Sequence, residues 1–448
     1  MKCRTGFPGW LCAFLTALCG FLACPAAAQD QPPTVDGNIS VFSSSADFYV
    51  DGKHIFTNAQ TTFLKPVVQN GQNVSITDPS IAQTLAVGDH VQVFGDSDRH
   101  THSIVATTIV LQPLTHDHIT GFAVVQQVLS TSPQLILEAD GYRIAITSKT
   151  TLHNKPPLND QTIPIANMWI DYKGRWNQDG LVVAEHAEYS NFAFSERFKK
   201  GLDKSKAKIV APVYEATPAA TSKDGEIVAP YLYAKKHTAS IPATLAVQQR
   251  IQQIGERLIP AAQKILANDD PQKIHFQFYA VDGIGFPVAI GSPDGLVILP
   301  IQTINALPTD DEVAAVLSEG IAEALEWQVP PAATGSAGPA MTAVGEMPFV
   351  GPIAGIALIS GGLFETYHGT YATRFDPWQR VRVGLSLMHD AGYDIRQAPL
   401  AWQILQYGIA KQAEKPPSTK SAYLLNIIGL EYAHDGKASS GTPQAAAK

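Results

Sequence analysis

Cysteine is absent from most of this 448-residue chain, because all four cysteines lie within its first 24 residues. They are Cys3, Cys12, Cys19 and Cys24. The rest of the chain therefore has no disulfide, no thiol nucleophile and no thiolate metal site. The chain also lacks a G-x-S-x-G elbow, a phosphate-binding loop of the G-x-x-x-x-G-K type, and any two histidines spaced four apart. These absences exclude the most easily recognised hydrolase, nucleotidase and zinc-peptidase sites.

Positive charge is also scarce, since 32 Lys and Arg residues stand against 40 Asp and Glu residues, a formal net charge of −8. An acidic chain of this kind argues against nucleic acid as a partner.

The first 28 residues predict the compartment. Lys2 and Arg4 precede an apolar run, and Ala26-Ala27-Ala28 supplies a small-residue cleavage site, so we predict a signal peptide at 1–28 and a periplasmic or secreted protein. Residues 21–24 also resemble a lipobox, which makes a lipoprotein anchored through Cys24 the alternative.

An internal repeat marks the region between about 37 and 192. Residues 51–55 and 61–63, which begin with Asp51-Gly52, recur at the same internal spacing as residues 140–144 and 150–152, which begin with Asp140-Gly141. Each copy alternates β-branched and aromatic residues between turn residues, which predicts about five short strands and a small barrel. These copies look like the OB-like repeat domains of unknown function found in exported bacterial proteins. We predict barrels at 37–113 and 119–192, and a scaffold or protein-docking role because neither has a basic groove.

The remainder divides by composition. Residues 193–241 contain a lysine cluster and short proline-bounded runs, and predict a basic linker. An amphipathic helix is predicted from about 242 to 267, with strands at 274–281 and 296–301. Thr309 and Glu312 form a predicted capping box that opens a long helix, and residues 433–448 have the composition of a disordered tail.

The long helix, residues 309–328, resembles the active-site helix of the HtpX-like and BepA-like gluzincin metallopeptidases (family M forty-eight). In that family the helix contains H-E-x-x-H, in which two imidazoles hold Zn²⁺ and the Glu activates water. Here the pentad is Glu319-Gly320-Ile321-Ala322-Glu323, so both imidazoles and the base are missing. The resemblance extends over about 245–432 and includes residues 288–299, which resemble the substrate-aligning edge strand of the family, with Val288 in place of an Asn and Asp294 in place of a Gly.

The third zinc ligand of the family falls at Pro377 in this chain, and Asp376 is one residue away. Asp376 followed by Pro377 also suits a helix N-cap and first-turn proline. No catalytic residue is therefore intact, the degenerate motif positions being Glu319, Gly320, Glu323 and Pro377. No cofactor is expected. The alternative is a divalent cation, zinc in active relatives, held by Glu319, Glu323 and Asp376.

These observations predict a multidomain protein with an N-terminal all-β part of two small OB-like barrels and a C-terminal α+β zincin-like domain at 242–432. The leading hypothesis is a pseudopeptidase that binds a polypeptide or envelope protein as a scaffold. An active metalloendopeptidase with an atypical metal site and a purely structural envelope protein remain alternatives. The uncharged stretch 347–364 gives a second route to membrane association, besides a lipidated Cys24.

Overall fold

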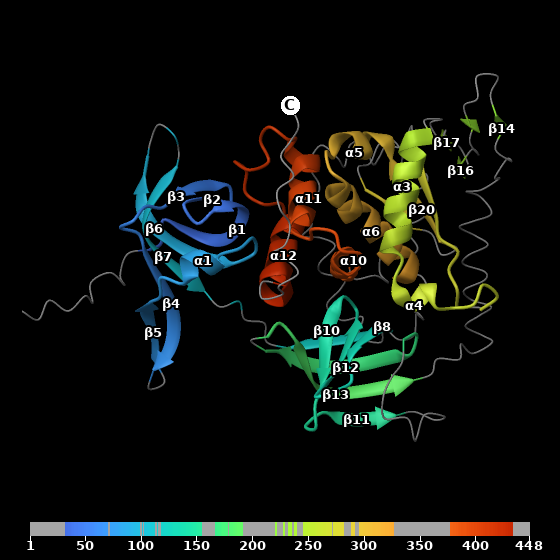
Figure 1. The fold of residues 1–448 in the computed structure, drawn as a ribbon, viewed down its shortest axis with the longest axis horizontal. Helices are drawn as coiled ribbons and strands as arrows, with labels where there is room; N and C mark the ends of the chain where they lie inside the picture. Colours follow the sequence, from blue (N-terminus) through green and yellow to red (C-terminus); the bar gives the residue numbers. More distant parts are fainter. Residues whose placement is uncertain are drawn as a thin grey trace, which may run out of the picture.

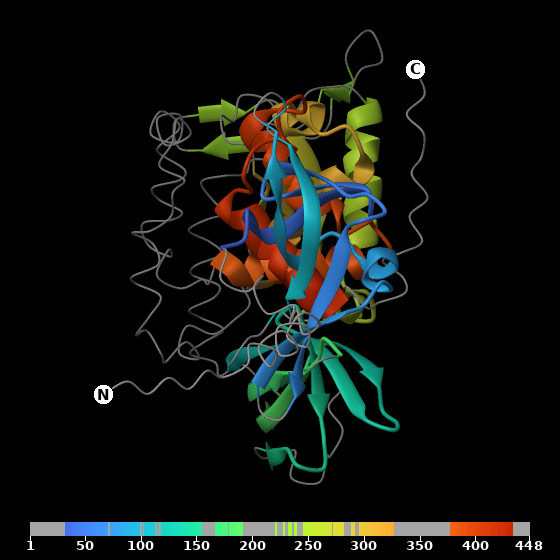
Figure 2. The same ribbon diagram turned by 90° about the vertical axis from the view of Figure 1, so that its left-hand side faces the viewer.

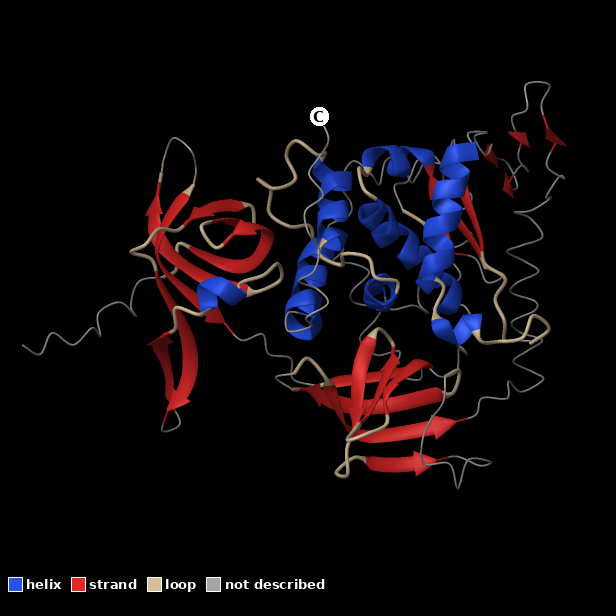
Figure 3. Cartoon of the chain, viewed as in Figure 1, coloured by secondary structure: helices blue, strands red, loops and turns tan. Residues whose placement is uncertain are grey.

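The computed structural model describes four main stretches of the chain, residues 32–154, 166–190, 245–326 and 377–432, and short strands between 220 and 239. Within the main stretches the gaps are 70–71, 99–100, 102, 113, 115–117, 178, 271, 282–287 and 292–294. Figure 1 shows two strand-rich bodies and a helix-rich body, and Figure 3 separates them by secondary structure. We call them barrel 1 (35–112), barrel 2 (119–190) and the helical region (245–432, as described).

Barrel 1 is a closed ring of five strands in the order β1-β2-β3-β7-β6. All neighbours are antiparallel except β3 and β7, whose parallel pairing closes the ring. A β4–β5 ribbon extends from β7, which places seven strands where the sequence predicts about five. The elements are β1 (Val35–Ser44), β2 (Asp47–Val50), β3 (Lys53–Phe56), β4 (Thr62–Gln69), β5 (Gln72–Thr77), α1 (Ile81–Thr84), β6 (His90–Ser97) and β7 (Ile104–Gln112).

Barrel 2 repeats this topology. Its ring is β8-β9-β10-β13-β12, it closes through the parallel pair β10–β13, and β11 takes the place of β4. The elements are β8 (Ile119–Ser130), β9 (Leu135–Ala139), β10 (Tyr142–Ile146), β11 (Thr151–Asn154), β12 (Trp169–Trp176) and β13 (Val182–Ser190). The two closed rings confirm the prediction of two small barrels, and their topology fits OB-like domains.

The repeat extends to single hydrogen bonds. Thr61 Oγ1 donates to the carbonyl of Ala106 at 2.7 Å, and Thr150 Oγ1 donates to that of Ala184 at the same distance. The β6–β7 pair of barrel 1 has a bulge at Gly95, and the equivalent β12–β13 pair of barrel 2 has one at Gly174. Because these contacts fix strand register, the sequence repeat identifies equivalent positions residue by residue.

The helical region contains a three-stranded sheet in the order β18-β20-β19, with helices packed against it. Its elements are α3 (Leu245–Leu258), α4 (Ala261–Lys264), β18 (Gln277–Val281), β19 (Ile290–Gly291), β20 (Leu296–Pro300), α5 (Ile301–Ala306), α6 (Asp310–Glu326), α10 (Pro377–Asp390), α11 (Gln397–Tyr407), α12 (Thr419–Ile427) and the π-helical segment η1 (Ile428–Tyr432). The helix expected at 242–267 is two helices, because Pro260 lacks the N–H that would continue α3.

Four short strands lie in the expected linker: β14 (Ala220–Thr221), β15 (Ile227–Val228), β16 (Leu232–Ala234) and β17 (His237–Ala239). They form two separate two-stranded pairs, β14–β15 and β16–β17. The predicted signal peptide, the stretch 347–364 and the tail 433–448 lie outside the described residues.

Both barrels contact the helical region through the same repeat turn. Asp51 and Asp140 each have positive φ, and so does the glycine that follows each of them, which suits a tight hairpin turn. A Cβ on Gly52 would overlap the backbone of Lys415 and Pro416, and a Cβ on Gly141 would lie 2.6 Å from the carbonyl carbon of Arg382. Each turn therefore needs glycine both for its backbone conformation and for its contact.

The two contacts differ in their surroundings. The buried residues of barrel 1 form a hydrophobic cluster of their own, centred on Ile39, Phe48 and Ile55. Those of barrel 2 belong to one cluster with the interior of the helical region. Figure 2 shows barrel 2 below the helices, where α10 packs against β10 and α4 against β8.

Buried charges lie at the boundary of barrel 2. Arg382 donates to the Asp140 carboxylate at 3.1 Å and to its carbonyl at 3.2 Å, and both side chains are buried. Nearby, Gln127 Nε2 donates to Glu138 at 2.5 Å and to Asp390 of α10 at 2.7 Å. Two carboxylates thus converge on one amide nitrogen across the boundary.

Candidate functional site

The predicted capping box starts α6. The Thr309 N–H donates to Glu312 Oε2 at 2.8 Å, and the Glu312 N–H donates to Thr309 Oγ1 at 3.2 Å, which confirms the prediction. Val313, Val316 and Ile321 are fully buried on this helix. The helix packs against the sheet on one side and against α10 and α11 on another, so it lies at the centre of the helical region.

Gly320, the second position of the degenerate motif predicted from the sequence, faces the sheet. A Cβ there would lie 2.7 Å from Val297 Cγ1 and 2.9 Å from the Ala289 side chain. Gly291 of β19 packs against the Gly320 carbonyl so closely that it has no room for a Cβ. A larger residue at 320 would force the helix off the sheet. Packing therefore explains the glycine, and the sequence alone gave no sign of this.

Glu319 and Glu323, the two carboxylates of the predicted degenerate motif, each pair with a basic side chain. Lys420 Nζ donates to Glu319 Oε2 at 2.7 Å. Arg380 donates to Glu323 Oε1 at 2.8 Å, and the Gly291 N–H donates to Glu323 Oε2 at 2.9 Å. Two cations from distant parts of the chain thus face the degenerate motif.

Lys420 is held on two sides. Its ammonium nitrogen lies 3.6 Å from the centre of the Trp402 ring, in a cation–π contact, while it bonds to Glu319. Burial lowers the pKa of Lys420, whereas the nearby charge of Glu319 raises that pKa. The pair is thus a partly buried salt bridge between α12 and α6.

Arg380 connects α10 to two turns of α6. Besides its bond to Glu323, its Nε lies 3.5 Å from Glu326 Oε2. Glu323 and Glu326 are buried, and removing their cation would leave uncompensated charge in the interior. A divalent cation at Glu319 or Glu323 would have to compete with the positive charge of the basic partner already there.

The remaining predicted positions are less informative. Pro377 begins α10, as expected for a first-turn proline, and Asp376 lies outside the described residues. In the described parts of the chain, no group of three or more His, Cys, Asp or Glu residues could hold a metal ion. Of the predicted metal ligands, Glu319 and Glu323 lie one turn apart on α6, and the position of Asp376 is not described.

The substrate-aligning edge strand expected within 288–299 corresponds to β19, which pairs antiparallel with β20 at the edge of the sheet. The Glu323 carboxylate accepts the Gly291 N–H, a donor that an added peptide strand could otherwise use. A polypeptide therefore cannot pair with β19 at Gly291 unless Glu323 moves.

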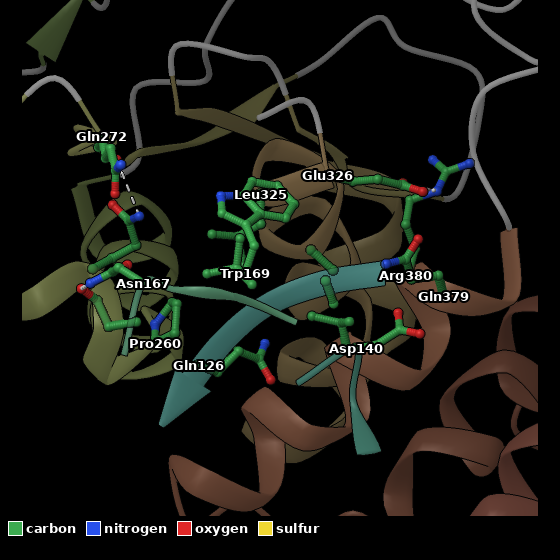
Figure 4. A pocket seen from close by; sticks show the side chains of 16 residues that line it. Gln126, Asp140, Asn167, Trp169, Pro260, Gln272, Leu325, Glu326, Gln379 and Arg380 are labelled. Atoms are coloured by element: carbon green, nitrogen blue, oxygen red, sulfur yellow. Dashed lines mark hydrogen bonds and ion pairs between the residues drawn. The ribbon is translucent and has the colours of Figure 1, made fainter. Parts of the chain in front are cut away.

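A cleft of ≈ 90 Å³ lies between barrel 2 and the helical region, beside the C-terminal end of α6. Figure 4 shows its walls, where barrel 2, α4, α6 and α10 meet. Trp169 and Leu325 give it apolar surface, Gln126 and Asn167 give it amides, and Arg380 lies at one end. Gln126 Oε1 is buried and has no hydrogen-bond partner among the described residues. The volume of the cleft is enough for several water molecules.

Among the described residues no helix combines the length and the hydrophobicity needed to cross a bilayer. The stretch 347–364 and Cys24 lie outside them.

Comparison with known proteins places a family on barrel 1. Residues 36–110 match a family described as a domain of unknown function (DUF5666), which fits the OB-like barrel observed there. None of the curated proteins matches the chain. The matched residues lie in barrel 1 and include no part of the helical region.

Proposed function

We propose that this chain is an exported, non-catalytic relative of the gluzincin peptidases that binds a polypeptide or envelope protein as a scaffold. The main support is that Glu319 and Glu323 are each neutralised by a cation of the chain itself. Lys420 pairs with Glu319 and Arg380 pairs with Glu323, at the two positions where the resemblance implies the metal ligands of an active relative. Carboxylates held in this way are satisfied without an ion, and neither cation can supply a proton acceptor for water.

The cleft beside Trp169 and Leu325 is the proposed binding site. Apolar walls with a few convergent polar groups are the usual make-up of a recognition pocket. The carbonyl of Gln126 offers an acceptor to an incoming N–H, and the cleft is large enough for a side chain of a bound polypeptide.

Metal analysis and proteolysis test the non-catalytic part. The purified protein should contain no stoichiometric transition metal and should leave casein uncut, with or without chelator. Chelator-sensitive cleavage that Glu323→Gln abolishes would establish the rival, an active metalloendopeptidase built on Glu319, Glu323 and Asp376. Circular dichroism of the variant distinguishes lost activity from lost folding.

Binding of fluorescently labelled casein, followed by anisotropy, tests the binding part. Gln126→Trp fills the cleft and should weaken binding about tenfold, which corresponds to about 1.4 kcal/mol. Gln253→Trp, on the exposed side of α3, is the matched control and should bind as the parent does. If the folded parent protein binds casein no better than the Gln126→Trp variant does, the purely structural role is favoured instead.

A further inference from the structure

The repeat allows one face of barrel 1 to be compared directly with its counterpart in barrel 2. Tyr49 pairs with His54 across β2 and β3, and the equivalent pair in barrel 2 is Glu138 with Arg143. Two residues after His54 on β3 lies Phe56, and the equivalent residue on β10 of barrel 2 is Ala145. These residues point outward, because Ile55 and Ile144 between them are fully buried inside their barrels.

In barrel 2 this outer face is covered by helical elements. Glu138 is 3% exposed and shares the Gln127 amide with Asp390 of α10. The Arg143 guanidinium lies over the ring of Tyr432 in η1, 5.1 Å from its centre. Ala145 has no exposed surface at all.

In barrel 1 the same face carries larger apolar groups and is open. Phe56 is 37% exposed, and Val105, which pairs with it across β3 and β7, is 44% exposed. Tyr49 stacks on His54 with ring centres 4.3 Å apart, and the ring centres of His54 and Phe56 are 4.1 Å apart. We call the residues Tyr49, His54, Phe56 and Val105 the aromatic face of barrel 1.

The aromatic face adjoins an established interface and has an acidic border. Burial raises the pKa of Tyr49, and the nearby charge of Glu414 in the helical region adds to this rise, so the face begins where barrel 1 meets that region. Asp47 bonds to His54 at 2.7 Å, and Asp96 pairs with Val105 across β6 and β7. Two carboxylates, Asp47 and Asp96, therefore border the exposed Phe56 and Val105, and a third, Glu414, lies near Tyr49.

We propose that the aromatic face of barrel 1 binds an amphipathic helix of a partner polypeptide, whose apolar side covers Phe56 and Val105 and whose flanks carry Lys or Arg. A helix is inferred because helical elements cover the equivalent face of barrel 2. Basic flanks are inferred from the carboxylates at the border. The proposal rests on the proposed function as a protein-binding module and gives it a second surface, separate from the cleft.

The probe is a labelled 18-residue synthetic helix with Leu and Phe along one side and Lys on both flanks. It is compared with a version in which Glu replaces every Lys. Fluorescence anisotropy with the full-length protein should give at least about tenfold tighter binding of the Lys version. The double variant Phe56→Ser/Val105→Ser should lose about tenfold or more in affinity for it.

The matched control is Leu152→Ser, which removes an apolar side chain of similar exposure, 40%, from barrel 2. It should bind the Lys helix as the parent does, and unfolding midpoints should show that all variants fold. Equal binding of the Lys and Glu helices, or an equal loss in Leu152→Ser, would overturn the proposal. So would self-association of the protein through Phe56 and Val105, seen by ultracentrifugation, because a second copy would then be the occupant. Casein binding that persists in the Phe56→Ser/Val105→Ser variant would leave the cleft, and the proposed function, intact.

Discussion

Barrel 1 keeps its own hydrophobic core, whereas barrel 2 shares one with the helical region. The two have the same ring of strands, the same threonine bond and the same glycine turn against a neighbouring backbone. They differ in the side chains around that turn, which are aromatic and partly exposed in one barrel and charged and buried in the other. The comparison teaches that a fold can be duplicated intact while the attachment of each copy is decided by a few outward-facing positions.

The largest effect is expected from Arg382→Met. Asp140 would stay buried without its cation, so the free energy of unfolding should fall by about 3–5 kcal/mol. In barrel 1, Lys415→Met alters the residue whose backbone meets Gly52, and an exposed side chain there should cost less than about 0.5 kcal/mol. Urea unfolding measures both. Equal losses would show that the two barrels are attached by similar forces.

The glycine turns give the next comparison. Gly141→Ala should destabilise the protein by about 2–3 kcal/mol, from backbone strain and from overlap with α10. Gly52→Ala meets residues 415–416, which are exposed and lie between α11 and α12, so it should cost about 1–2 kcal/mol. Hydrogen exchange should show faster exchange in barrel 1 alone for Gly52→Ala. Faster exchange in both barrels would contradict their separate cores.

A pH dependence should belong to barrel 2. Burial raises the pKa of Glu138 to about 8, and the neighbouring Asp390 carboxylate adds to this rise. The folded state therefore keeps a proton that the unfolded state loses above its ordinary pKa of 4.5. Stability should fall as pH rises from about 4.5 to about 8, by at most about 1.4 kcal/mol per pH unit from this group, and level off above.

Glu138→Gln should flatten that slope, because an amide cannot lose the proton. Tyr49→Phe changes the equivalent position of barrel 1 and should leave the slope unchanged, since the pKa of Tyr49 lies above 10. Urea unfolding between pH 5 and 8 compares the three proteins. An unchanged slope in Glu138→Gln would assign the pH dependence to another group.

The smallest difference is expected where the barrels are most alike. Thr61→Val and Thr150→Val each remove a hydroxyl that donates to a strand carbonyl, and each should cost about 1 kcal/mol. Thermal unfolding, followed by circular dichroism, should give losses that agree within about 0.5 kcal/mol. A large difference would mean that the repeat is equivalent in geometry and not in energy.

The repeat and the central helix were the parts most accessible from the sequence. Both depend on local patterns: the Asp-Gly turns fix hairpin geometry, and Thr309 with Glu312 caps its own helix turn. The paired cations were missed because Arg380 and Lys420 lie 57 and 101 residues from their carboxylates, and no local pattern connects them. Pro260 was a signal that could have been used, since it divides the expected helix into α3 and α4.

The sequence of barrel 2 did not indicate that buried charged residues would attach this barrel to the helical region. In sequence both strands place a polar or polar-tipped residue between two apolar ones, Tyr49 between Phe48 and Val50 and Glu138 between Leu137 and Ala139, yet Tyr49 is half-buried whereas Glu138 is buried. Only the packing of α10 and η1 decides that this carboxyl is buried. A zincin-like arrangement of the helical region stays a prediction, since its motif positions are those most altered.

Two neighbouring arginines of α10 serve different partners, Arg380 the carboxylates of α6 and Arg382 the turn of barrel 2. Because both belong to one rigid helix, a displacement of barrel 2 also displaces the cation that neutralises Glu323. The neutralisation of a buried carboxylate on α6 therefore depends on the position of a barrel that contributes no residue to that ion pair.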